Sequence, residues 1–102
     1  QDGGAMNALI REGDVLRLSG DVTYDNAEAL CAEGLGLLAG ISSSPIVDLA
    51  GLTTASSLTV AMLLRWARAA AARGQSLRLT QVPERCLAII RVSGLTDALP
   101  EV

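Results

Sequence analysis

The densest group of reactive side chains in the sequence is a run of hydroxyl residues in the middle of the chain: Thr53, Thr54, Ser56, Ser57 and Thr59. They surround the predicted start of a long helix. Ser or Thr at a helix start accepts hydrogen bonds from free backbone N–H groups, so capping by Ser56 or Ser57 is one interpretation. Phosphorylation is the other, because the helix dipole and free amides stabilise a phosphate there. The residues alone leave both open.

Other catalytic chemistry has few candidates. Asp48 and Glu84 are carboxylates that can serve as acid and base, but no third group, glycine-rich phosphate loop or metal-ligand spacing accompanies them. The chain has no histidine, which excludes Ser-His-Asp and Cys-His relays and zinc–histidine sites. Cys31 and Cys86 lie far apart without CxxC spacing, which predicts reduced core residues. We therefore expect no enzyme activity, no metal and no cofactor, and expect Asp48 to bind loop amides.

Composition and charge exclude several classes of binding partner. The 102 residues include 8 basic and 11 acidic side chains, for a net charge of −3, and the only aromatic residues are Tyr24 and Trp66. Scattered arginines and no stacking platform argue against nucleic acid. No window reaches the roughly 18 apolar residues of a membrane span, and no signal-peptide pattern opens the chain, so we expect a cytosolic protein without direct membrane insertion. Residues 1–7 are expected to be a flexible leader or a non-native extension, and residues 8–102 a single domain.

The elements that must position these side chains follow from periodicity and turn residues. Alternating apolar residues predict strands, and apolar residues three and four positions apart predict helices. The order is β-β-α-β-α-β-α. Strands are predicted near Ala8–Arg11, Val15–Leu18, Ile46–Leu49 and Leu77–Thr80, and helices near Ala27–Leu38, Ser57–Arg73 and Pro83–Ser93. Strands that alternate with helices predict an α/β fold with a small mixed sheet and helices packed on it.

The predicted Ser57–Arg73 helix is apolar on two sides. The expected core stripe consists of Val60, Leu63, Leu64, Ala67 and Ala71. A second stripe, bordered by Arg65 and Arg73, consists of Leu58, Met62, Trp66 and Ala69. A surface helix is normally polar opposite its core stripe. Either neighbouring helices of the same domain cover the second stripe, or it is a docking surface, since Met, Trp and Arg are enriched in interface cores.

Two motifs in the sequence resemble the STAS domain family, the sulfate-transporter and anti-sigma-factor-antagonist fold. The first is Val47-Asp48-Leu49-Ala50-Gly51-Leu52, followed after a short loop by Ser56-Ser57 and an apolar helix; the second is Arg91-Val92-Ser93-Gly94-Leu95. By position, Ser57 matches the phospho-acceptor of the family. Ser56 stands where the family usually has Asp, and Thr59 where it usually has Gly. These departures make partner binding, rather than phosphorylation, the primary expectation.

Within that family the chain is most similar to the MlaB-like group, through residues 13–21 of the predicted hairpin and 95–100 of the tail. The resemblance implies a regulatory subunit that docks on the ATPase of a Gram-negative ABC transporter, which moves phospholipids and maintains outer-membrane lipid asymmetry. It would lie peripheral to the inner membrane. The alternative is an anti-sigma-factor antagonist that binds a serine kinase and is switched at Ser57. The expected partner-binding residues are Thr54, Ser56, Ser57, Leu58, Thr59, Met62, Arg65, Trp66 and Ala69.

Overall fold

The computed structural model describes residues 8–53 and 55–102 of the chain. The elements run β1 (Ala8–Glu12), β2 (Val15–Gly20), α1 (Ala27–Ala39), β3 (Ile46–Leu52), α2 (Ser57–Ala72), β4 (Arg78–Thr80) and α3 (Glu84–Val92). This is the order that the periodicity predicts. Strand β3 extends three residues beyond the predicted range, through the Ala50-Gly51-Leu52 part of the first motif. Thr54 and the predicted leader 1–7 lie outside the described residues.

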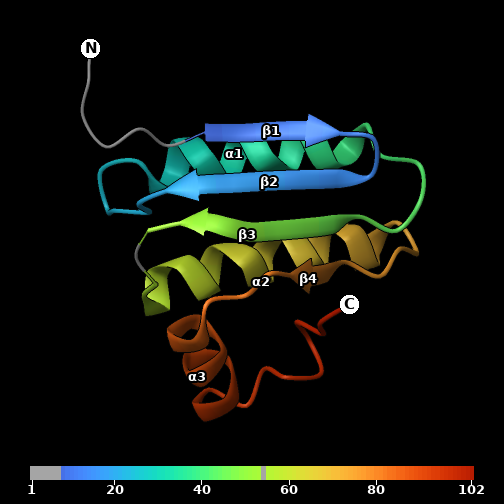
Figure 1. Cartoon of the computed structure of the whole chain (residues 1–102). Coiled ribbons are helices and arrows are strands. Elements are labelled where there is room, and N and C mark those ends of the chain that lie inside the picture. The colour runs from blue at the N-terminus through green and yellow to red at the C-terminus, as the bar shows by residue number, and fades with distance from the viewer. Residues whose placement is uncertain (1–7, 54) are drawn as a thin grey trace.

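The four strands form one mixed sheet in the order β1-β2-β3-β4 (Figure 1). β1 and β2 form an antiparallel hairpin, whereas β2 pairs with β3, and β3 with β4, in parallel. The C-terminal segment continues the sheet past β4: the Leu79 N–H donates to Pro100 O at 2.9 Å, and the Val102 N–H donates to Leu79 O at 2.8 Å. The predicted small mixed α/β sheet is confirmed.

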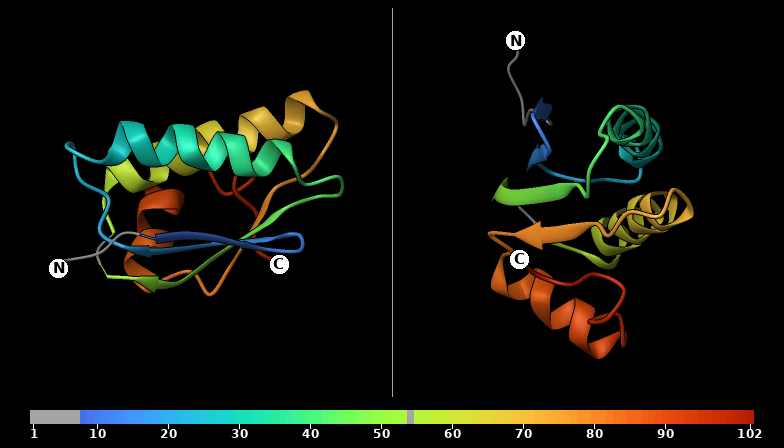
Figure 2. Two further views of the ribbon diagram at one scale, coloured as in Figure 1. Left: turned by 90° about the horizontal axis from the view of Figure 1, so that it is seen from above. Right: turned by 90° about the vertical axis from the view of Figure 1, so that its right-hand side faces the viewer.

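Helices α1 and α2 lie side by side on one face of the sheet, and α3 lies beyond the β4 edge (Figure 2). The strands turn alternate apolar residues toward the two helices, as period-two patterning requires. These buried strand residues are Leu16, Leu18, Val47, Leu49 and Leu79. Both cysteines are free and buried, as predicted, and burial raises the pKa of the Cys86 thiol. No described helix is long and apolar enough to cross a membrane.

The buried face of α2 differs from the predicted one. It consists of Thr59, Val60, Met62, Leu63, Trp66 and Ala70. Val60 and Leu63 were expected there, but Leu64 and Ala67 are half-buried and Ala71 is exposed. The cause is the packing of α1 against the side of α2 that carries Trp66.

The indole of Trp66 fixes the contact between α1 and α2. The ring is fully buried, and its Nε1–H donates to Cys31 O at 3.1 Å. On α1, Gly34 leaves the space that the ring fills: a Cβ built there would overlap Cζ2 and Cε2 and lie 2.7 Å from Nε1 of the indole. The missing side chain at Gly34 therefore lets α1 cover the second apolar stripe of α2.

Candidate functional site

Ser56, and not Ser57, caps α2. The backbone of Ser56 is extended, and its Oγ accepts a hydrogen bond from the Thr59 N–H at 3.3 Å. Thr59 is fully buried beside it, with its Oγ1 3.4 Å from Ser56 Oγ. Thr53 Oγ1 hydrogen-bonds to a carboxylate oxygen of Asp21. Ser57, the first residue of the helix, is exposed to solvent. The Ser57 hydroxyl is therefore both accessible to solvent and placed at the positive end of the helix dipole.

Asp48 has a structural role. Its Oδ1 accepts a hydrogen bond from the Ala50 N–H at 2.9 Å, which confirms the expectation that it binds a nearby amide. Its Oδ2 lies 3.6 Å from Arg17 Nε, and Arg17 Nη1 lies 2.8 Å from Glu12 Oε1. Asp48 is therefore held by β-sheet neighbours. Within residues 8–53 and 55–102, no group of three or more Cys, Asp or Glu side chains is arranged to hold a metal ion.

The predicted partner-binding residues fall into separate environments. The exposed ones are Ser57 and Arg65, and the half-buried ones are Ser56, Leu58 and Ala69. The buried ones are Thr59, Met62 and Trp66. The expectation that Met62 and Trp66 present an exposed stripe is therefore wrong: α1 covers them, which is the alternative that the sequence left open. Thr54 lies outside the described residues.

Two hollows flank the first turns of α2. One, of about 350 Å³, lies between the starts of α1 and α2, with Leu58, Met62 and Arg65 on the α2 side and Tyr24 at its rim. The Tyr24 side chain is 89% exposed. Only the edge of Met62 contributes here, because this residue is 3% exposed. The hollow offers a partner an apolar floor, an exposed aromatic ring, and one charge of each sign, from Arg65 on α2 and Glu28 on α1.

The second hollow, of about 290 Å³, lies between α2 and α3. Ser57 contributes from α2, and Arg85, Ile89 and Val92 contribute from α3. Val92 is 89% exposed, so an uncovered aliphatic side chain stands at the rim of this hollow. An apolar residue with a nearby arginine is typical of an interface and does not supply an acid–base pair.

We call these two hollows together the α2-start surface, defined by Tyr24, Ser57, Leu58, Arg65, Arg85 and Val92. Sequence reasoning identified the α2 residues but missed Tyr24, Arg85 and Val92. A signal for Val92 was present, since the core side of α3 carries Cys86 and Ile90, and Val92 falls off that stripe. Tyr24 precedes α1 in a turn, where helical periodicity gives no information.

Comparison with known proteins bears on the family and the fold of the chain. The family model described as "Mlab, STAS domain" matches residues 7–101. None of the curated proteins compared with the chain matches it. A chain of the Acinetobacter MlaFEDB complex in an ATP-bound conformation is 31% identical, with a TM-score of 0.75, over 90% of this chain and 97% of that one.

Two anti-sigma-factor antagonists share the fold. The unphosphorylated form of the anti-sigma factor antagonist SpoIIAA is 19% identical, with a TM-score of 0.74, over 95% of this chain and 88% of that one. A STAS domain protein from Planctomyces limnophilus is 16% identical, with a TM-score of 0.68, over 93% and 87% of the two chains. At these identities the likeness concerns the fold.

Proposed function

Since the chain belongs to the Mlab family of STAS domains, we propose that it is a non-enzymatic binding subunit of an Mla-type phospholipid-transport ABC complex. In this proposal it docks on the ATPase subunit through the α2-start surface and regulates or stabilises that subunit. It would then lie in the cytoplasm of a Gram-negative cell, peripheral to the inner membrane through the complex.

The observation that carries the proposal is the 31% identical chain of the Acinetobacter MlaFEDB complex, nearly all of which this chain covers. The residues support a binding role. Tyr24 and Val92 flank the same helix start, and each is 89% exposed. A partner that covers them removes much apolar surface from water, which favours binding. Arg85 is the charged residue of the second hollow and favours an acidic residue on the partner there, whereas the first hollow carries both Arg65 and Glu28.

Docking would act by linkage. A subunit that binds only the folded, assembled ATPase stabilises that state in proportion to the logarithm of its free concentration over Kd. The two hollows lie on either side of one helix start, so a partner that fills both would be held by α1, α2 and α3 together. The expected effect is a more stable ATPase, without any chemical step performed by this chain.

Co-purification with the ATPase subunit of an Mla-type complex from the same cell tests the proposal. Val92→Asp places a charge on the proposed surface without loss of core, because the side chain is exposed. We expect it to weaken binding about tenfold or more, as truncation of central interface residues does. Ile10→Asp is the matched control, since Ile10 is 52% exposed on β1, away from α2 and α3. Equal binding by both variants would refute the surface. Met62 and Trp66 are unsuitable for this test because both are buried.

A second function, an anti-sigma-factor antagonist switched at Ser57, is favoured by one specific observation. Ser57 is exposed at the first position of α2, and Arg85 lines the same hollow. A phosphate on Ser57 would meet the helix dipole and an arginine, both of which stabilise it. Incubation with a cognate serine kinase and ATP, followed by mass spectrometry, tests this alternative. It requires a phosphate on the wild-type chain that is absent from Ser57→Ala; an unmodified wild-type chain would exclude it.

A further inference from the structure

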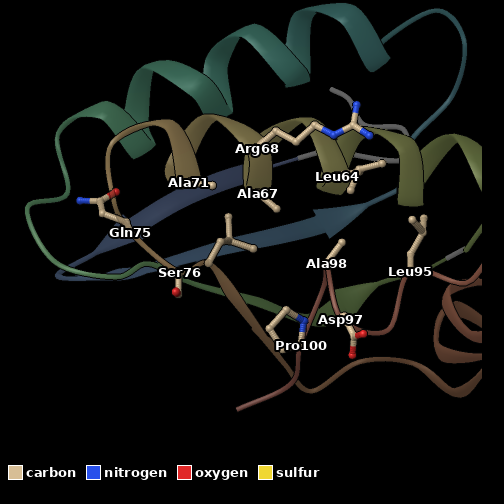
Figure 3. A pocket seen from close by; sticks show the side chains of 11 residues that line it. Leu64, Ala67, Arg68, Ala71, Gln75, Ser76, Leu95, Asp97, Ala98 and Pro100 are labelled. Atoms are coloured by element: carbon tan, nitrogen blue, oxygen red, sulfur yellow. The ribbon is translucent and has the colours of Figure 1, made fainter.

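The far end of α2 carries a groove that the docking proposal does not use. It lies between the last turns of α2 and the C-terminal segment, and its volume is about 330 Å³ (Figure 3). Leu64, Ala67 and Ala71 line it from the helix, and Leu95 and Ala98 line it from the other side. These three α2 residues belong to the stripe that the sequence assigns to the core, yet the structure leaves them half-buried or exposed. An apolar helix face without a cover is typical of an interaction surface.

The groove carries one charged side chain on each rim, and the two charges have opposite signs. Arg68 extends from α2 on one rim, and Asp97 lies on the C-terminal segment at the opposite rim (Figure 3). Both side chains are exposed, and they are the two charged residues that line the groove. The ion pairs of residues 8–53 and 55–102 join Arg17 to Glu12 and to Asp48, so neither Arg68 nor Asp97 takes part in one.

This arrangement is complementary to itself. Helix α2 forms one wall of the groove, and the side chains at positions 67 and 71 of that wall are only alanine methyl groups. If two copies meet about a twofold axis, α2 of each enters the groove of the other, and Arg68 of each copy faces Asp97 of its partner. The alanines at positions 67 and 71 permit the short interaxial distance of packed helices, about 8–10 Å. A charge on each rim, of opposite sign, fits this pairing without any third component.

We propose that the chain forms a homodimer through this groove, held by α2–α2 packing and two symmetric Arg68–Asp97 ion pairs. The inference is independent of the ATPase proposal. Both surfaces use α2 and they adjoin in the middle of the helix, where Leu64 and Arg68 line the groove and Arg65 lines the hollow at the helix start. Tyr24, Ser57 and Val92 of the α2-start surface do not line the groove.

Sedimentation equilibrium of the purified chain, over a concentration series, tests the dimer. The wild type is expected to associate reversibly. Arg68→Asp and Asp97→Arg are each expected to raise the dimer dissociation constant about tenfold or more, because one substitution converts both symmetric pairs into like-charge contacts. The double variant Arg68→Asp/Asp97→Arg restores both pairs and is expected to return to within about threefold of the wild type. Arg91→Asp, the same charge change on an exposed residue outside the groove, is the matched control and should leave association unchanged.

Several outcomes would overturn the proposal. A wild-type chain that stays monomeric at every concentration would do so, as would a double variant that associates no better than the single ones. Thermal melts of all variants show whether a loss of association reflects unfolding. Photo-cross-linking from position 71, in cells that contain the transporter, identifies the occupant directly. A cross-link between two copies supports the dimer, and a cross-link to another protein alone assigns the groove to that protein instead.

Discussion

The space at Gly34 makes a sharp prediction about how α1 covers α2. Gly34→Ala places a methyl group where the structure has the indole of Trp66, within 2.7 Å of Nε1 and nearer still to two ring carbons. The ring is rigid, fully buried and held by its hydrogen bond to Cys31 O. It cannot rotate away without losing that bond, so α1 and α2 must separate.

The expected magnitude is the balance of two effects. Overpacking of a well-packed core costs about 1–3 kcal/mol, and the direct overlap with a rigid ring places this substitution at or above the upper end. Alanine also stabilises the helix by about 1 kcal/mol relative to glycine, because it is the better helix former. We therefore expect Gly34→Ala to lower the free energy of unfolding by about 2 kcal/mol, which corresponds to a fall in Tm of about 8–16 °C for a domain of this size.

Two matched variants make the test specific. Gly36 lies two residues along the same helix, is exposed, and has no heavy atom within 4 Å of an added Cβ. Gly36→Ala should raise the free energy of unfolding by about 0.5–1 kcal/mol. In a Trp66→Leu background the ring is gone, and Gly34→Ala should no longer destabilise. Thermal and urea unfolding measure all of these variants. A stabilising Gly34→Ala in the wild-type background would refute the packing described for Trp66.

Three further predictions concern single groups. Burial raises the pKa of the Cys86 thiol. The neutral thiol therefore contributes its full stabilisation below the unfolded-state pKa, and this stabilisation is lost as the pH rises through the folded-state pKa. In urea unfolding, the wild type should lose more stability than Cys86→Ala between about pH 7 and about pH 10. Asp48→Asn keeps an acceptor for the Ala50 N–H and should cost under about 1 kcal/mol in the same assay, whereas Asp48→Ala should cost about 1 kcal/mol more. Ser56→Ala removes the α2 cap and should cost about 1 kcal/mol in thermal unfolding, and no change would contradict the capping role.

The order of the elements could be predicted from the sequence because it depends on local patterns. Alternation in Val15–Leu18 and helical spacing after Ser57 each report on a few neighbouring residues. The motif of residues 47–52 indicated the STAS family, and the family-model match over residues 7–101 confirms it. Even the helix cap lay within the predicted pair, Ser56 or Ser57.

The buried face of α2 could not be predicted in this way, because it depends on a contact between distant parts of the chain. The sequence of α2 alone places Trp66 opposite the expected core stripe, which favours an interface residue. Trp66 is a core residue because Gly34, on α1, leaves room for its ring. The same packing leaves Leu64 and Ala71 uncovered, against the pattern. Tyr24 and Val92 entered the site for a related reason: the fold brings the starts of α1 and α2 and the end of α3 together, and no local pattern contains that information.

Site-specific photo-cross-linking to the partner ATPase tests the central claim most directly. A photoreactive residue at Val92 samples the α2-start surface, and one at Ile10 samples β1 as the control; both positions are exposed, so neither substitution opens the core. We expect a cross-link to the ATPase subunit from position 92 and none from position 10. A cross-link from position 10 but not from position 92 would contradict it, as would the absence of any cross-link from position 92 in an assembled complex.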